Sequence, residues 1–92
     1  MGLERQGGVG TRESVKQFAD AMEKVLARND HKDGWEKCTN LYLIQRMIEE
    51  ASEVLQRLDA GELGDMAEEA IDVANFAMMI YDNNADHIDK EG

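Results

Sequence analysis

The chain has 92 residues, a formal net charge of −10, no proline and an aromatic content of 5%. This length allows one small domain, and the abundance of Ala, Leu, Met and Glu favours helices over a β-sandwich or barrel. The excess of acidic over basic residues, 20 against 10, argues against a nucleic-acid polymer or an anionic membrane as the partner. The single cysteine, Cys38, cannot form an internal disulfide. No segment has the pattern of a membrane span or a signal peptide, so we expect a cytoplasmic protein.

Glycine is concentrated at the start of the chain, and we expect a disordered arm over residues 1–10. Residues 11–92 are expected to form a single helical domain. Its first helix is predicted from about Thr11 to Arg28, with Thr11 and Ser14 as capping hydroxyls, because apolar residues then recur at i, i+3 and i+4.

A polar loop at residues 29–34 is expected to separate this helix from a second one. The second helix is predicted from Asn40 to about Asp59, with Thr39 or Asn40 as its cap. Its apolar residues form one stripe, which we expect to face the next helix. The stripe consists of Leu41, Ile44, Met47, Ile48, Ala51, Val54, Leu55 and Leu58. Gly61 and Gly64 mark the turn that follows.

The third helix is expected to begin after Gly64 or Asp65 and to end near Tyr81, with a short extra turn or frayed tail over residues 85–92. Its C-terminal half is apolar almost all round, so it needs partners on several sides. Two helices of the same chain do not enclose it fully. We therefore expect a second copy to complete a four-helix core, in a homodimer or a tetramer of such dimers.

Asp72 lies in a largely apolar run, where an unpaired carboxylate is costly. Residues three apart on a helix lie about 60° apart around its axis, so Glu69 and Asp72 share a face, as do Glu50 and Glu53. If the two helices pack antiparallel, all four carboxylates converge. Their repulsion is relieved most simply by a shared divalent cation, and oxygen ligands suit Mg²⁺ or Mn²⁺. The alternative is that the Glu residues solvate exposed faces, which fits Asp72 least well.

These acidic residues form a recognisable pattern. Glu49-Glu50-x-x-Glu53, fifteen further residues, and then Glu69-x-x-Asp72 resemble the EExxE…ExxD signature of the MazG-type all-α nucleotide pyrophosphohydrolases. The resemblance extends from residues 34–35, before the second helix, to residues 72–76 in the third.

The resemblance implies a helical dimer or tetramer that uses Mg²⁺ to hydrolyse nucleoside triphosphates to monophosphate and pyrophosphate. It implies Glu50, Glu53, Glu69 and Asp72 as metal ligands. Glu49 is then a further ligand, a residue that supports a ligand, or the group that orients the attacking water. The implied role is removal of unwanted or excess (d)NTPs.

Four further side chains are candidates for substrate binding, each with a structural alternative. Asn75, one turn after Asp72, binds phosphate or sugar, or is a hydrogen-bonded core residue. Trp35 stacks on a base or anchors the start of the second helix. Lys37 and Arg46 contact phosphates or are solvated surface charges.

Other functional classes remain open at this point. A catalytically idle helical dimer would keep the scaffold as a structural or regulatory module, without metal dependence. A di-iron bundle usually needs Glu-x-x-His pairs, and neither His31 nor His87 has Glu three positions before it. A related histidine-biosynthesis pyrophosphohydrolase is closer in chemistry, but nothing in the sequence selects its larger substrate.

Overall fold

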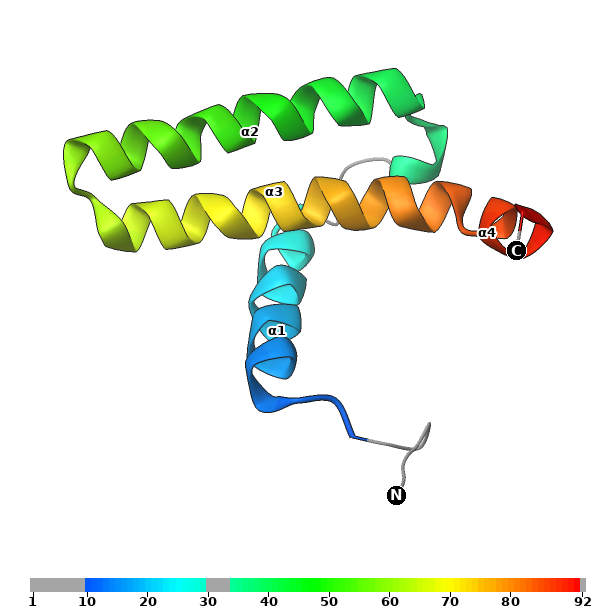
Figure 1. The fold of residues 1–92 in the computed structure, drawn as a ribbon, viewed down its shortest axis with the longest axis horizontal. Coiled ribbons are helices and arrows are strands. Elements are labelled where there is room, and N and C mark those ends of the chain that lie inside the picture. Colours follow the sequence, from blue (N-terminus) through cyan, green and yellow to red (C-terminus); the bar gives the residue numbers. More distant parts are fainter. Residues whose placement is uncertain (1–9, 30–33, 92) are drawn as a thin grey trace.

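The computed structural model describes residues 10–29 and 34–91, and all regular structure in these ranges is helical (Figure 1). The expected all-α class is therefore confirmed. The arm expected over residues 1–10 lies outside the described residues apart from Gly10, and so do positions 30–33 of the expected loop. None of the described helices has the continuous apolar length that crossing a membrane requires.

Two long antiparallel helices form the centre of the fold (Figure 1). Helix α2 spans Asn40–Ala60 and helix α3 spans Leu63–Asn84. Helix α1, Glu13–Ala27, projects away from the α2–α3 pair, and its C-terminal end packs against the middle of α3 (Figure 1). The 3-10 turn η1, Trp35–Lys37, leads into α2, and the short helix α4, Asp86–Glu91, follows α3.

The two ends of α2 follow from local chemistry that is visible in the sequence. At its start, Thr39 Oγ1 accepts a hydrogen bond from the backbone N–H of Tyr42 at 3.1 Å, which satisfies one of the free donors of the first turn. At its end, Gly61 adopts the left-handed conformation with φ of 75° and donates to backbone carbonyls of the last turn. The predicted cap and the predicted turn glycine are confirmed.

The start of α1 corrects one expectation. The residue before the helix is Arg12, whose carbonyl accepts the first helical hydrogen bonds from Val15 and Lys16 at 3.1 Å. No side chain caps this end. The expectation that Thr11 and Ser14 supply the cap is therefore wrong, because the helix begins at Glu13, after Thr11 and before Ser14.

Helix α3 is longer at both ends than expected, and Gly64 lies inside it. The polar residues that follow the expected end at Tyr81, from Asp82 to Asn84, belong to the helix. Asn84 Nδ2 donates to the Ile80 carbonyl at 2.7 Å and to Asn40 Oδ1 at 2.8 Å, while Asn40 Nδ2 donates back to Asn84 Oδ1 at 3.2 Å. This reciprocal amide pair joins the end of α3 to the start of α2.

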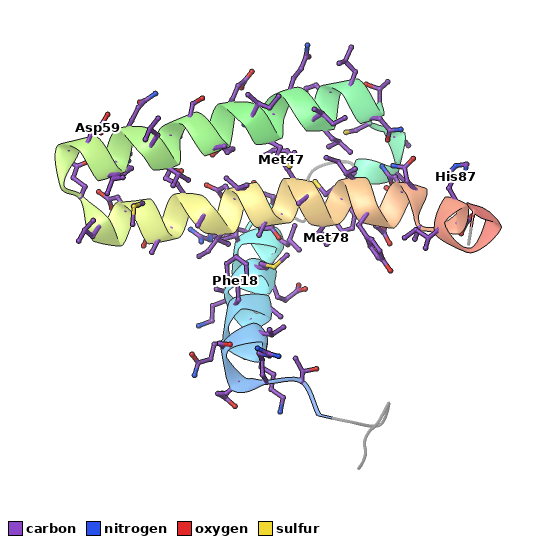
Figure 2. All side chains as sticks on the ribbon, viewed as in Figure 1. Phe18, Met47, Asp59, Met78 and His87 are labelled. Carbon is purple, nitrogen blue, oxygen red and sulfur yellow. The ribbon has the colours of Figure 1, made fainter. Side chains whose placement is uncertain are left out.

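The apolar side chains of α2 correct a second expectation. Most of the predicted stripe faces away from α3: Ile48 is 58% exposed and Leu55 is 60% exposed. We call the exposed part of this stripe the outer stripe. It consists of Leu41, Ile44, Ile48, Ala51, Leu55 and Leu58. Leu43, outside the predicted stripe, is the buried apolar residue of the described core, with 1% exposure, and Met47 lies between α2 and α3 (Figure 2).

The side of α2 that is covered carries charge as well as apolar groups. Its charged members are Arg46, Glu50, Glu53 and Arg57, all buried or half-buried. The antiparallel arrangement of α2 and α3 is thus as expected. The predicted apolar stripe does not form the contact between them, because charged side chains occupy much of the face of α2 toward α3.

The two glycines near the turn provide a matched pair for a stability measurement. Both have open space where a Cβ would be added, but only Gly61 has a positive φ. We expect Gly61→Ala to lower the free energy of unfolding by roughly 1–2 kcal/mol, because the left-handed conformation strains any Cβ. Gly64→Ala should raise it by up to about 1 kcal/mol, because alanine favours the helix.

Urea denaturation of both variants checks this expectation. Equal changes of the same sign in the two variants would contradict the assigned turn.

Candidate metal centre

Three carboxylates converge between the two long helices. Each of Glu50 on α2 and Glu69 and Asp72 on α3 offers one oxygen that lies within 4.8 Å of the other two. Glu50 is buried, with 7% exposure, and the other two are half-buried. The one-turn spacing of Glu69 and Asp72 puts both on the face of α3 that meets α2. We call Glu50, Glu69 and Asp72 the carboxylate trio.

Glu53, the fourth expected ligand, lies beside the trio rather than among the converging oxygens. Its pKa is raised, first by the negative charge of Glu50 and then by a hydrogen bond shared with Glu69. Both effects require Glu53 to lie near Glu50 and Glu69, so Glu53 can join the trio around a cation.

The pKa of Asp72 is also raised. Loss of hydration on burial is the main cause, followed by the negative charge of Glu69, while Arg28 acts in the opposite direction. The site therefore holds more negative charge than its surroundings stabilise. A divalent cation would supply the missing positive charge.

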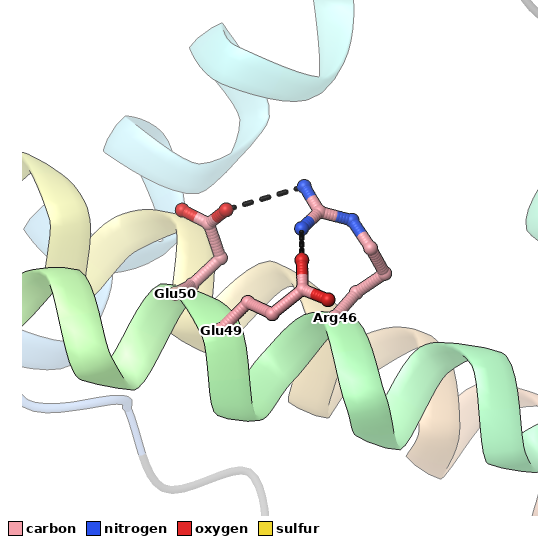
Figure 3. Close-up of polar contacts among 3 residues, drawn as sticks. All are labelled: Arg46, Glu49 and Glu50. Atoms are coloured by element: carbon pink, nitrogen blue, oxygen red, sulfur yellow. Dashed lines mark hydrogen bonds and ion pairs between the residues drawn. The ribbon is translucent and has the colours of Figure 1, made fainter.

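Two arginines of α2 flank the trio. Arg46 pairs with Glu49 and, at 3.2 Å, with Glu50 (Figure 3). Arg57 Nε lies 3.5 Å from Glu69, and its Nη1 lies 2.8 Å from Glu62. Each arginine thus pairs with one member of the trio and also with carboxylates outside it: Arg46 with Glu49, and Arg57 with Glu62 and, at 4.0 Å, with Asp65.

Glu49 is not brought into the cluster. Its side chain is 61% exposed and pairs with Arg46. The guanidinium of Arg46 also lies 5.1 Å from the centre of the Phe76 ring, a distance at which a cation is attracted to the ring face. Glu49 therefore helps to hold Arg46 in place.

A cavity of about 670 Å³ adjoins the trio, with Glu50 and Asp72 in its wall. Three of the four substrate candidates line it: Trp35, Arg46 and Asn75. Lys37 is exposed and lies in the wall of neither this cavity nor the second one described below. The structure thus brings all but one of the candidates together.

Asn75 and Trp35 are held by contacts between elements. Asn75 is 4% exposed, and its Nδ2 donates to the Met22 carbonyl of α1 at 3.4 Å, while its Oδ1 has no partner among the described residues. Trp35 Nε1 donates to Asp82 Oδ2 at 2.9 Å, and its carbonyl accepts from Asn83 Nδ2 at 3.1 Å. Trp35 therefore anchors η1 to α3 and also presents a side chain to the cavity.

Several site residues were missed in the sequence. Tyr42 and Phe76 line the larger cavity, and Lys24, Arg28 and Arg57 line the second one. Arg57 follows Glu53 by four positions, so its place on the same helical face was a usable signal. Lys24 on α1 and Arg28 just after it had no such signal, because only the packing of the end of α1 on α3 brings them to the site.

The donor set fits a hard divalent cation. It consists of carboxylate oxygens, which Mg²⁺ and Mn²⁺ prefer, and the described residues around it add no thiolate or imidazole. The oxygens lie close enough for one ion to contact ligands from both helices. His87 lies on α4, beyond the end of α3 (Figure 2).

Comparisons with known proteins add no identification: no family model, no curated protein and no solved structure matched the chain.

The raised pKa of Asp72 has a consequence for the metal-free protein. A carboxyl whose pKa is higher in the folded than in the unfolded state destabilises the fold at a pH where it is ionised in both states. This destabilisation disappears as the pH falls toward the pKa that the carboxyl has in the unfolded chain. We expect Asp72→Asn to raise the melting temperature in EDTA near pH 7, and this advantage to shrink as the pH is lowered toward 4.

Thermal melts over this pH range test the expectation, with Asp20→Asn, at an exposed position of α1, as the matched control. A destabilised Asp72→Asn at neutral pH would instead identify Asp72 as a structural ion-pair partner.

Proposed function

We propose that the chain is a Mg²⁺-dependent nucleoside triphosphate pyrophosphohydrolase of the MazG type, with Mn²⁺ as an alternative cofactor. The observation that carries the proposal is the convergence of Glu50, Glu69 and Asp72, which come from the two halves of the EExxE…ExxD motif. Chance acidic residues along two helices have no reason to meet at one point in a partly buried interface, where their repulsion is costly.

The larger cavity beside the trio supports a nucleotide as the substrate. Trp35, Tyr42 and Phe76 line it, and aromatic faces stack on bases. Arg46 and Asn75 add a cation and an amide, which suit phosphate and sugar. Small-molecule sites usually combine apolar and aromatic side chains with a small number of placed polar groups.

The reaction breaks the bond between the α-phosphorus and the oxygen that bridges it to the β-phosphorus. A water oxygen forms the new bond to the α-phosphorus and loses its proton to solvent, and the electron pair of the broken bond stays on pyrophosphate. The bound cation supplies Lewis acidity and lowers the pKa of bound water.

In this proposal the chain's own residues have distinct roles. Glu50, Glu53, Glu69 and Asp72 hold the cation. Glu49 acts through Arg46, which it holds beside the cavity wall. The proposed cellular role is removal of unwanted or excess (d)NTPs in the cytoplasm.

One observation favours a second candidate, a catalytically idle helical scaffold. Arg46 and Arg57 already pair with two members of the trio, Glu50 and Glu69. In an idle scaffold these ion pairs would be the final state of the cluster, and no metal would be needed.

The product distinguishes these candidates. With Mg²⁺ and a panel of canonical and modified nucleoside triphosphates, we expect pyrophosphate and a monophosphate. Asp72→Asn should lower turnover at least roughly a hundredfold, because a direct metal ligand matters more than the groups that support it. Millimolar Mg²⁺ should raise the melting temperature of the wild type and not of this variant.

Asp20→Asn again serves as the control. Release of orthophosphate with a diphosphate would contradict the reaction, and a melting temperature insensitive to Mg²⁺ and Mn²⁺ would favour the idle scaffold.

We further propose that two copies associate through the outer stripe of α2. Its residues alternate at spacings of three and four, which is the pattern of a coiled-coil seam. They are exposed in a single chain, and Leu43 is the buried apolar residue of the described core. A small domain with so little buried apolar area needs a partner surface.

A charge on the outer stripe tests this association. Leu55→Arg should give a single-chain species with a melting temperature lowered by many degrees, because a symmetric contact would bury the new charge twice. Gln56→Arg, the next residue and also exposed, is the matched control and should leave assembly unchanged. Light scattering reports the mass, and a wild-type mass near 10.3 kDa with cooperative unfolding would contradict the proposal.

A further inference from the structure

A second cavity, of about 330 Å³, shares Asp72 with the larger one. Glu50 lines the larger cavity, and Glu69 lines the smaller. The carboxylate trio therefore lies at the boundary between two separate spaces. A substrate that contacts a cation held by the trio can extend into both.

The two cavities differ in their chemistry. Three aromatic side chains and one arginine line the larger. The smaller has no aromatic residue in its described wall, but it has three cations from two segments of the chain: Lys24 on α1 with Arg28 just after it, and Arg57 on α2. The first kind of wall suits a base and sugar, and the second suits a chain of phosphates.

We propose that the smaller cavity holds the β- and γ-phosphates of the substrate on Lys24, Arg28 and Arg57, and hence the pyrophosphate product. This inference rests on the proposed function, because cleavage next to the α-phosphate requires that atom to lie at the trio. The nucleoside then extends into the larger cavity and the remaining phosphates into the smaller one.

The acidic residues of the smaller cavity fit this assignment. Its three cations face four carboxylates, Asp65, Glu68, Glu69 and Asp72. The formal charge of the wall is therefore negative, and one bound divalent cation makes it positive. The wall then attracts phosphate only when metal is bound. Arg28 is near enough to the trio to act on the carboxyl of Asp72.

The direct test is calorimetric titration of inorganic pyrophosphate into the full chain with Mg²⁺ present. We expect Lys24→Gln and Arg28→Gln each to weaken binding roughly tenfold or more, because each removes a charge-assisted hydrogen bond to phosphate. Both residues are exposed, so neither change removes a core contact. Lys16→Gln, on α1, and Arg12→Gln, at the residue before α1, are matched controls that line neither cavity, and they should bind as the wild type does.

A nucleoside monophosphate provides the second measurement, because it leaves the smaller cavity empty. Its affinity should be the same in wild type, Lys24→Gln and Arg28→Gln. Unchanged pyrophosphate affinity in these variants would overturn the inference, as would an equal loss of monophosphate affinity, which would mean a general loss of positive potential.

The two proposals can fail separately. If the wild type releases pyrophosphate from nucleoside triphosphates and the glutamine variants bind it normally, the reaction stands and this inference is wrong. If no triphosphate is hydrolysed but pyrophosphate binds and depends on Lys24 and Arg28, the proposed reaction is wrong and the polyphosphate site stands.

Discussion

The fold depends on how charge is neutralised between α2 and α3. Arg46, Glu50, Glu53 and Arg57 follow one another at spacings of three and four, so they share one helical face, and that face is turned toward α3. The attraction within such ion pairs offsets little more than the free energy of hydration that the charged groups lose on burial. The hairpin therefore gains less stability from this interface than an apolar interface of the same area would supply. The apolar residues that would supply more are turned outward on α2.

Much of the fold was predictable because its signals are local. The Thr39 cap, the left-handed Gly61 and the periodicity of α2 each depend on a few neighbouring residues. The longer α3 was not predictable in this way, because Asn84 is held by Asn40, from the far end of the hairpin. The prediction that the apolar stripe of α2 faces α3 failed for a similar reason. Periodicity identifies an apolar face but does not say which neighbour covers it.

For the candidate site, helical spacing together with antiparallel packing predicted that Glu50, Glu53, Glu69 and Asp72 converge, and all of them but Glu53 do. The cations were harder to find. Lys24 and Arg28 reach the smaller cavity only because the C-terminal end of α1 packs on α3, and no pattern in the sequence predicts that packing. Lys37 shows the converse error, since nearness in sequence to the site did not bring it to either cavity.

Arg46 and Arg57 link metal binding to substrate binding in the proposed function. Arg46 and Arg57 pair with Glu50 and Glu69, and each also lines one of the two cavities. On the proposed function, a cation that binds Glu50 and Glu69 releases each arginine from its partner in the trio, so that more of its charge can act on phosphate, while Arg46 stays paired with Glu49 and Arg57 with Glu62. Metal binding and substrate binding then reinforce each other through the same two side chains.

The reciprocal pair of Asn40 and Asn84 has a consequence for the register of the hairpin. The Gly61 turn fixes α2 against α3 at one end, and the two amides fix them at the other. A slide of one helix along the other by a single turn, about 5.4 Å, would break the amide pair and stretch the turn. The same slide would move Glu50 away from Asp72 by a distance too large for one ion to span. The axial alignment of the carboxylates is thus set at the two ends of the hairpin, by residues that are themselves uncharged.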